Sequence, residues 1–286
     1  MDNNCKICGS SRLSIYQHTA TCLSCGVLLY YPYPKSDTDL LTSGEGKPFS
    51  QIDTLEWYTK SSFFNHHNFT QMIRFAMDES YKNKNLSILD YGGGGGQFSL
   101  VFRSLYPEAS VFITDICDAA LLDQWRDCNI QIPYNSFATD ETKFDFIFLN
   151  DVFEHLSDPS QILQLLAKKL KENGKIFIDT PRQFWIYPVT KIFSKNIYKK
   201  VLKGTVSFAH LQIWSKSSFE IVVRDSGLKC IKYSECSEYT MPPEFYMNNM
   251  GISSSIIRSI GKLFYRFAKY IAKNKIICVL SKNNGM

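Results

Sequence analysis

Short apolar runs alternate with helix-like patterns from residue 86 onward. Because strands bury alternate residues and helices bury every third or fourth, this alternation is typical of a parallel sheet covered by helices. The predicted strands cover 87–90, 110–115, 144–151, 174–181 and a short piece near 130–133. The predicted helices between them cover 97–105 and 159–171.

The same pattern continues to the end of the chain and changes before residue 86. A helix at 217–226 and strands at 228–234 and 276–281 complete the predicted α/β region. Aromatic residues at loosely helical spacing over 49–82 predict a helical cap, so residues 35–85 form a connector between an N-terminal segment and the sheet.

Five consecutive glycines, Gly92 to Gly96, follow the first of these strands and precede a helix. Glycine lacks a Cβ, so such a run lets a ligand approach the backbone N–H groups closely. The spacing does not fit the G-x-G-x-x-G dinucleotide pattern, because Gln97, Phe98 and Ser99 occupy the third position in the three registers. No Lys-Ser or Lys-Thr follows, so a phosphate-binding P-loop is excluded as well.

The remaining pattern, Asp90-x-Gly92-x-Gly94-x-Gly96, resembles the first motif of class I S-adenosylmethionine (SAM) methyltransferases. In that family the loop holds the methionine half of the cofactor. Asp115 ends the next strand, where an acid can accept hydrogen bonds from both ribose hydroxyls. The segment 144–159 looks like the family's fourth strand and the loop after it, which lines the cofactor. The resemblance therefore implies a SAM site formed by Asp90, Gly92, Gly94, Gly96, Asp115, Ile116, Asn150, Asp151 and Val152.

Two Cys-x2-Cys pairs lie at the N-terminus, Cys5 with Cys8 and Cys22 with Cys25, separated by 13 residues. Four thiolates at this spacing can close a tetrahedral zinc site without an open coordination position, so the metal would be structural. Free buried thiols or a redox pair are the alternative. Two prolines after the next apolar run end the predicted zinc ribbon at residue 34, which leaves 86–286 as the SAM-binding domain.

Composition narrows the class of protein without changing this picture. The chain has 286 residues, 44% of them apolar, which is ample for a core. It contains no run of about 18 apolar residues and no basic, apolar leader at its N-terminus, so a cytoplasmic location is expected. The nine cysteines then argue against a disulfide framework, and a net charge of +5 does not by itself indicate nucleic acid.

Taken along its length, the chain resembles the zinc-ribbon class I methyltransferases found among sugar and surface-polysaccharide modification enzymes. The resemblance rests on the paired cysteines, the aromatic connector, the glycine motif and the run His210 to Ser215 before a helix. It implies an α/β fold, a Rossmann-like seven-stranded mostly parallel sheet with a small N-terminal zinc ribbon. The chain departs from the family in Tyr91 and the extra glycines, and it lacks the additional C-terminal domain of sugar C-methyltransferases.

Two histidines are candidate general bases for methyl transfer. His155 follows the fourth strand beside Glu154, and His210 precedes a later helix. An alcohol acceptor benefits from a base near neutral pH, and imidazole suits that role. A hydrogen bond that only fixes a loop is the alternative for each histidine.

Two segments outside the cofactor motifs are candidate partner surfaces. The stretch 182–210 combines aromatic residues and lysines, which suits a sugar bearing acidic groups, or else forms a solvated basic face. Residues 252–273 predict a basic amphipathic helix, either packed by its apolar stripe on the sheet or a second subunit, or lying peripherally on an anionic membrane.

Three functions remain open at this point. The first is a SAM-dependent methyltransferase acting on a sugar or related small molecule, nucleotide- or lipid-linked. The second is an RNA methyltransferase whose ribbon grips nucleic acid, although residues 1–34 carry only Lys6 and Arg12 as cations. The third is a binding protein that has lost catalysis, which the intact glycine motif argues against.

Overall fold

The computed structural model describes nine stretches of the chain: 4–16, 18–34, 66–82, 84–117, 121–182, 210–237, 243–249, 253–271 and 273–283. Most of the predicted connector and nearly all of the predicted substrate segment, 35–65 and 183–209, lie outside these residues.

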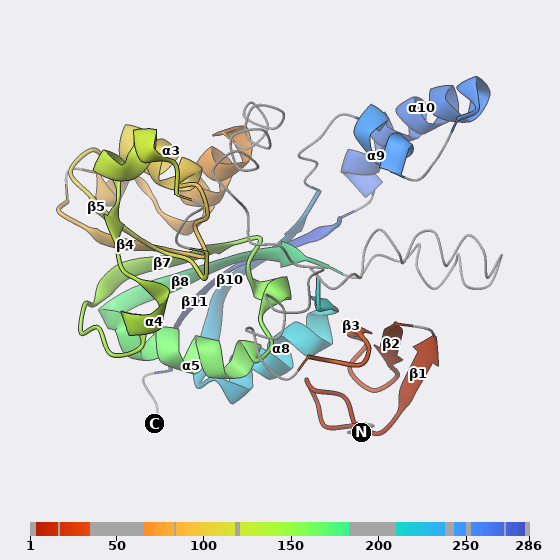
Figure 1. Cartoon of the computed structure of the whole chain (residues 1–286), viewed down its shortest axis with the longest axis horizontal. Coiled ribbons are helices and arrows are strands. Elements are labelled where there is room, and N and C mark those ends of the chain that lie inside the picture. The colour runs from red at the N-terminus through yellow and green to blue at the C-terminus, as the bar shows by residue number, and fades with distance from the viewer. Residues whose placement is uncertain are drawn as a thin grey trace.

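A seven-stranded sheet forms the centre of the molecule (Figure 1). Its strands lie in the order β10-β11-β8-β7-β4-β5-β6. They are β4 (Ser87–Tyr91), β5 (Ser110–Thr114), β6 (Ile130–Gln131), β7 (Phe144–Asn150), β8 (Leu170–Pro181), β10 (Leu228–Cys236) and β11 (Lys275–Lys282). Six strands run in the same direction, and β11, between β8 and β10, is antiparallel to both of its neighbours. The predicted fold class is confirmed.

Helices cover both faces of this sheet (Figure 1). A helix over 66–76 and α3 (Gln97–Leu105) lie on one face. The other face carries α4 (Tyr134–Phe137), α5 (Pro159–Lys169) and α8 (Lys216–Asp225). Short 3-10 turns occur at η1 (Glu79–Tyr81), η3 (Asp123–Cys128) and η4 (Phe153–His155).

Local sequence signals explain where helix α5, on the second face, begins. The side chain of Asp158 accepts a hydrogen bond from the Gln161 N–H (2.9 Å) and Pro159 occupies the first helical position of α5, both favourable at a helix start.

Strand β8 begins at Leu170, four residues before the predicted start. Residues 171–173 are polar and exposed, so their pattern does not read as a strand, yet Leu170 pairs with Phe144.

The apolar residues of the strands alternate between two cores. Ile88, Phe146 and Phe148 pack with the 66–76 helix and α3. Leu89 and Ile147, which alternate with them along the strands, belong instead to the core under α5 and α8. This two-sided burial is why the strands read as nearly continuous apolar runs.

The N-terminal ribbon is joined to the main domain by a strand from far along the chain. Its sheet has the order β1-β2-β3-β9, with β1 (Leu13–Tyr16), β2 (Thr19–Cys22), β3 (Leu28–Tyr30) and β9 (Gln212–Ile213). β9 pairs antiparallel with β3, and the ribbon's buried residues form one core with Trp214 and Phe219. A strand from far along the chain thus completes the sheet of the ribbon.

Two helices near the C-terminus, α9 (Pro243–Asn249) and α10 (Ser255–Ile271), lie apart from the sheet (Figure 1). The predicted helix at 252–273 is thus present. The described side chains of its apolar stripe do not pack on the sheet, because Ile256, Leu263 and Phe267 are more than half exposed. Among the described residues, no helix is both long and apolar enough to cross a membrane.

We expect Trp214→Ala to lower the free energy of unfolding by about 3–5 kcal/mol, the usual cost of emptying a large buried aromatic site. Trp214 is fully buried, stacks on Phe153 at 4.8 Å and lies beside the strand that joins the ribbon to the domain. Urea unfolding measures the change. Leu100→Ala, at an exposed position of α3, is the control and should stay within about 0.5 kcal/mol. Equal effects of the two changes would contradict this description of the core.

Candidate functional site

The glycine loop between β4 and α3 leaves no room for side chains. Gly92, Gly94 and Gly96 have φ values of +74°, +51° and +87°, in the left-handed region that favours glycine. A Cβ at Gly93, where φ is unremarkable, would lie 2.5 Å from the Asp90 Oδ2 atom. A Cβ at Gly92 would lie 2.6 Å from a Val152 methyl group. Val152 thus packs against the loop, as expected for a residue of the same site.

Buried polar atoms lie at the carboxyl ends of the adjacent strands β4 and β7. Asp90 is 1% exposed, and its Oδ2 atom has no hydrogen-bond partner among the described residues. The same holds for both side-chain amide atoms of Asn150. Burial, and then the nearby Asp115 carboxylate, raises the pKa of Asp90 to about 8, while the adjacent Asn150 side chain acts in the opposite direction. Such groups are costly in a folded protein unless a ligand satisfies them.

Asp115 connects the end of β5 to the glycine loop. Its Oδ2 atom accepts a hydrogen bond from the Gly94 N–H (2.9 Å), and its Oδ1 atom accepts one from the Cys117 N–H (2.7 Å). The next residue, Ile116, is 36% exposed. An acid fixed against the loop, a cradle without Cβ atoms and buried polar atoms beneath it together fit a SAM molecule. The individual cofactor contacts stay predictions.

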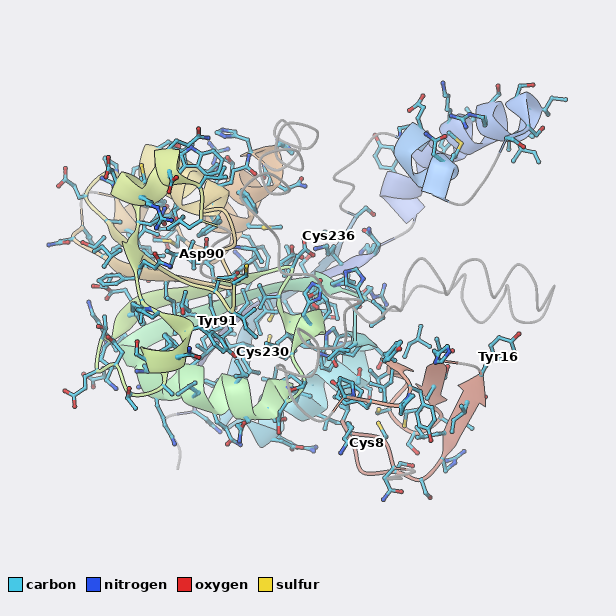
Figure 2. The ribbon with its side chains drawn as sticks, viewed as in Figure 1. Cys8, Tyr16, Asp90, Tyr91, Cys230 and Cys236 are labelled. Atoms are coloured by element: carbon cyan, nitrogen blue, oxygen red, sulfur yellow. The ribbon has the colours of Figure 1, made fainter. Side chains whose placement is uncertain are left out.

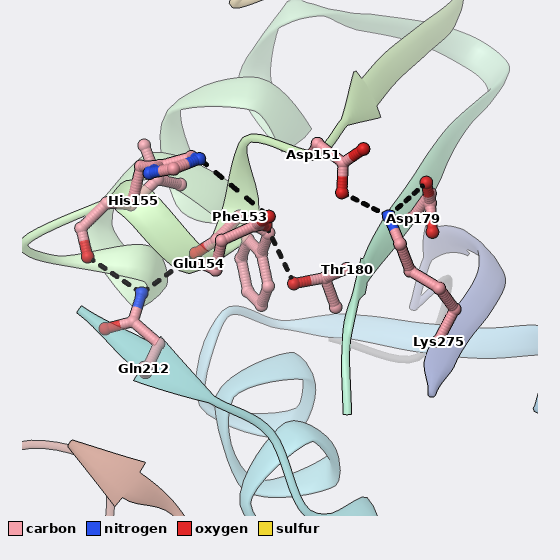
Figure 3. A network of polar contacts seen from close by, with 9 residues as sticks. Asp151, Phe153, Glu154, His155, Asp179, Thr180, Gln212 and Lys275 are labelled. Carbon is pink, nitrogen blue, oxygen red and sulfur yellow. Dashed lines mark hydrogen bonds and ion pairs between the residues drawn. The ribbon is translucent and has the colours of Figure 1, made fainter. Parts of the chain in front are cut away.

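Asp151 continues the chain from β7 in a strained conformation. Its φ is +52°, uncommon for a residue other than glycine. The Lys275 ammonium forms an ion pair with Asp151 and another with Asp179 at 2.9 Å (Figure 3). Removal from water would raise the pKa of Asp151. The Lys275 charge outweighs this effect and holds the pKa of Asp151 below its usual value. Strand β11, which begins at Lys275, therefore fixes the loop that carries the candidate catalytic residues.

Both predicted catalytic histidines lie in one cluster with Glu154. The ring centres of His155 and His210 are 5.0 Å apart, and His155 Nε2 lies 3.8 Å from a Glu154 carboxylate oxygen. Thr180 donates a hydrogen bond of 3.0 Å to the other oxygen (Figure 3). Burial, and then Asp151, raises the pKa of Glu154 to about 7. Proton exchange within this cluster is therefore accessible near neutral pH, although the catalytic roles stay predictions.

Gln212, at the start of β9, fixes the turn that holds Glu154 and His155. Its Nε2 group donates to the Phe153 carbonyl (2.9 Å) and to the Leu156 carbonyl (3.0 Å), on either side of that pair (Figure 3). Its Oε1 atom accepts a hydrogen bond from the Tyr33 hydroxyl. The Leu211 N–H also donates to the Glu154 carbonyl at 2.9 Å.

The four N-terminal cysteines form one cluster in the ribbon, well away from Asp90 (Figure 2). Their sulfur atoms all lie within 4.8 Å of one another, with Cys5 and Cys25 at 3.8 Å and Cys8 and Cys22 at 3.5 Å. Tetrahedral zinc with Zn–S bonds of about 2.3 Å needs sulfur atoms about 3.8 Å apart, so the arrangement fits zinc.

Sequence reasoning missed several residues of the site. Lys275 starts the last apolar strand, and nothing in its local pattern links it to Asp151. Thr180 ends a buried strand without any motif of its own. Gln212 did carry a signal, since it is a polar residue within the apolar run Leu211 to Trp214. A fully buried amide in such a run needs hydrogen-bond partners, and here they are backbone carbonyls of the turn that carries the candidate catalytic residues.

Comparisons with known proteins agree with this geometry. The family profile described as "Methyltransferase domain" matches residues 64–233. The ubiquinone biosynthesis O-methyltransferase of Glaesserella parasuis is 33% identical over 135 residues, which cover 42% of this chain and 56% of that protein. The corresponding protein of Hydrogenovibrio crunogenus is 24% identical over 193 residues, 63% of this chain and 77% of that protein. The chain spans about half the length of the Candida albicans and Glaesserella relatives that it matches.

Solved structures share the fold at low sequence identity. Phosphoethanolamine N-methyltransferase 2 of Haemonchus contortus, in complex with SAM, has a TM-score of 0.57 and 16% identity, over 90% of this chain and 63% of that one. The [4+2]-cyclase SpnF has a TM-score of 0.51 and 12% identity, over 77% and 81%. The cyclase demonstrates that this fold alone does not fix a reaction. The family match covers more than half of the chain, and on that ground the protein belongs to the methyltransferase domain family, with the class I SAM-dependent fold.

Proposed function

We propose that the protein transfers a methyl group from SAM to a hydroxyl group of a small molecule. The observation that carries the proposal is the pairing of two sites at the carboxyl ends of β4 and β7. One is the glycine cradle with the buried Asp90 and Asn150, and the other is the cluster of Glu154, His155 and His210.

The chain's own residues divide the chemistry between positioning and proton removal. Bound SAM supplies a methyl group on a positively charged sulfur. The glycine loop and Asp115 hold the cofactor in place, so that an acceptor aligned with the methyl group gains most of the acceleration from orientation. His155 takes the acceptor's proton, and Glu154 beside it stabilises the charged imidazole. His210, in the segment just before β9, lies beside the His155 imidazole.

Oxygen is the acceptor atom that the histidine cluster favours. An alcohol oxygen is a weak nucleophile and needs a base to take its proton as the methyl group is transferred, whereas a neutral amine can attack before it loses a proton. The relatives named as O-methyltransferases support the same choice. For the acceptor molecule we propose a sugar or a related small molecule, nucleotide- or lipid-linked, in line with the resemblance to zinc-ribbon sugar enzymes. An acceptor in ubiquinone biosynthesis is the second candidate, favoured by the relatives' names.

RNA is the weaker candidate acceptor. The ribbon's small sheet uses its edge to pair with β9 of the main domain and contributes few cations to its surface. A phosphate backbone is usually bound by a cluster of Lys and Arg residues.

For the ribbon we propose a structural zinc ion held by Cys5, Cys8, Cys22 and Cys25. All four positions of a tetrahedral ion are then occupied by protein, so the ion stabilises the ribbon and takes no part in methyl transfer. Ser215 donates a hydrogen bond to the Cys25 carbonyl, which connects the Cys22–Cys25 turn of the ribbon directly to the start of α8.

SAM binding tests the first step of this proposal. By titration calorimetry, we expect the protein to bind SAM and Gly93→Ala to bind it at least about tenfold more weakly, a loss of about 1.4 kcal/mol. The added Cβ would lie 2.5 Å from Asp90 Oδ2, so the loop must shift. Leu100→Ala, exposed on the helix after the loop, should bind as the unchanged protein does. Absence of SAM binding by folded, zinc-loaded protein would overturn the proposed activity.

Transfer of a labelled methyl group from SAM tests the acceptor. We expect product with a hydroxyl-bearing acceptor from a panel of nucleotide-linked sugars and catechols, and none with RNA. His155→Gln should lower kcat by about 10²–10³-fold, the usual contribution of a general base. The rate should also rise with pH as the imidazole loses its proton, and this rise should vanish in the variant.

SAM affinity of His155→Gln should be unchanged, which separates catalysis from folding. His18→Gln, in the ribbon, is the matched control. If His155→Gln retained full activity and the same pH profile, the histidine would be structural, and Glu154→Gln would be the next variant to test.

Metal content tests the ribbon. Native mass spectrometry should find a single zinc ion per chain, and Cys22→Ser should lose it together with several kcal/mol of unfolding free energy, because a structural zinc site contributes directly to folding. Cys128→Ser, outside the cluster, should retain both. A metal-free protein as stable as the zinc-loaded one would contradict the structural role.

A further inference from the structure

Helix α10 packs on α9 through one of its faces. The Arg258 guanidinium donates a hydrogen bond to Asn248 Oδ1 (2.8 Å), and the Lys262 ammonium pairs with Glu244 at 2.7 Å. Between them, Gly261 lies so close to Met247 that a Cβ would be 2.6 Å from its sulfur. These contacts identify the side of α10 that faces the rest of the protein.

The opposite side of α10 carries an exposed apolar stripe. Its members are Ile256, Ile260, Leu263, Phe267 and Tyr270, with exposures of 71%, 61%, 56%, 56% and 74%. At 100° per residue they fall within about 80° of the helix circumference. Single exposed apolar residues are ordinary, but a continuous stripe of this kind marks an interaction surface. Because α9 occupies the other side, it does not cover the stripe.

The charge of this segment selects the partner. No acidic residue follows Glu244 in the chain, whereas α10 and the residues just after it contain Arg258, Lys262, Arg266, Lys269 and Lys273. Arg258 and Lys262 bind α9, which leaves Arg266, Lys269 and Lys273. An anionic lipid surface complements these remaining cations and accepts the apolar stripe below its headgroups. A second copy of the same helix would bring two cationic segments together, which disfavours self-association as the explanation.

The dimensions agree with a helix that lies in the membrane plane. α10 has 17 residues, a length of about 25 Å at 1.5 Å per residue, and its four cations are incompatible with spanning the bilayer core. The sheet and the glycine loop lie apart from it (Figure 1), so lipid contact at α10 leaves the cofactor site free. We propose that α10 anchors the protein peripherally to anionic membranes through this stripe.

Vesicle co-sedimentation of the full chain tests the proposal. We expect binding to phosphatidylcholine vesicles that contain phosphatidylglycerol, little binding to phosphatidylcholine alone, and weaker binding at high salt. Leu263→Glu combined with Phe267→Glu should lower the bound fraction at least about tenfold, because it places charge in the stripe. Leu100→Glu makes the same kind of change at an exposed leucine of α3 and should bind as the unchanged protein does.

SAM calorimetry on each variant distinguishes loss of lipid binding from loss of fold, since α10 packs on α9 and not on the sheet. Absence of vesicle binding, binding that does not depend on anionic lipid, or binding unaffected by the double substitution would each overturn the proposal. So would a dimer of the unchanged protein, seen by light scattering, that dissociates in the double variant.

Discussion

The pairing of β9 with β3 is the constraint on which the arrangement of the site depends. Two residues, Gln212 and Ile213, form the edge strand of the ribbon's sheet, and Gln212 also supports the turn that carries the candidate catalytic residues. The backbone of β9 bonds to the ribbon, while the Gln212 side chain bonds to the carbonyls of Phe153 and Leu156. A shift of the ribbon would therefore move Glu154 and His155 with it. The cysteine cluster, although remote from Asp90, is mechanically connected to the site.

A second connection enters from the other end of the chain. Lys275, nearly buried at the start of β11, pairs with Asp179 and with Asp151. A buried ammonium needs such partners. Because Lys275 is held by Asp179, its ion pair with Asp151 helps to keep Asp151 in a left-handed backbone conformation. Strain of this kind persists only where the surroundings over-determine it. The turn after β7 is thus held on one side by Gln212 and on the other by Lys275.

Most of the fold could be predicted from the sequence because its strands and helices have recognisable local patterns of apolar residues. Buried runs such as 144–151 and the helix-like patterns between them are local signals, and they placed the elements to within a few residues. The exception, the early start of β8, arose where exposed polar residues 171–173 continue a ladder that their pattern hides. Within the candidate site, the glycine motif and both histidines have local signals in the sequence, but Lys275 and Thr180 have none. Their roles depend on contacts between strands distant in sequence, for which no local pattern exists.

The glycine loop also carries an energetic argument about the cofactor. Beneath it lie a carboxyl group whose pKa is raised to about 8 and an amide whose polar atoms find no partner among the described residues. Without a ligand these groups destabilise the fold, since burial of an unsatisfied polar group costs about 1–3 kcal/mol. Sequences free to optimise stability alone would replace Asp90 and Asn150 with apolar residues of similar size. Their presence at the ends of two adjacent parallel strands is explained if a positively charged, polar ligand completes their hydrogen bonds. A sulfonium cofactor has this character, whereas an uncharged apolar ligand would leave both groups unsatisfied.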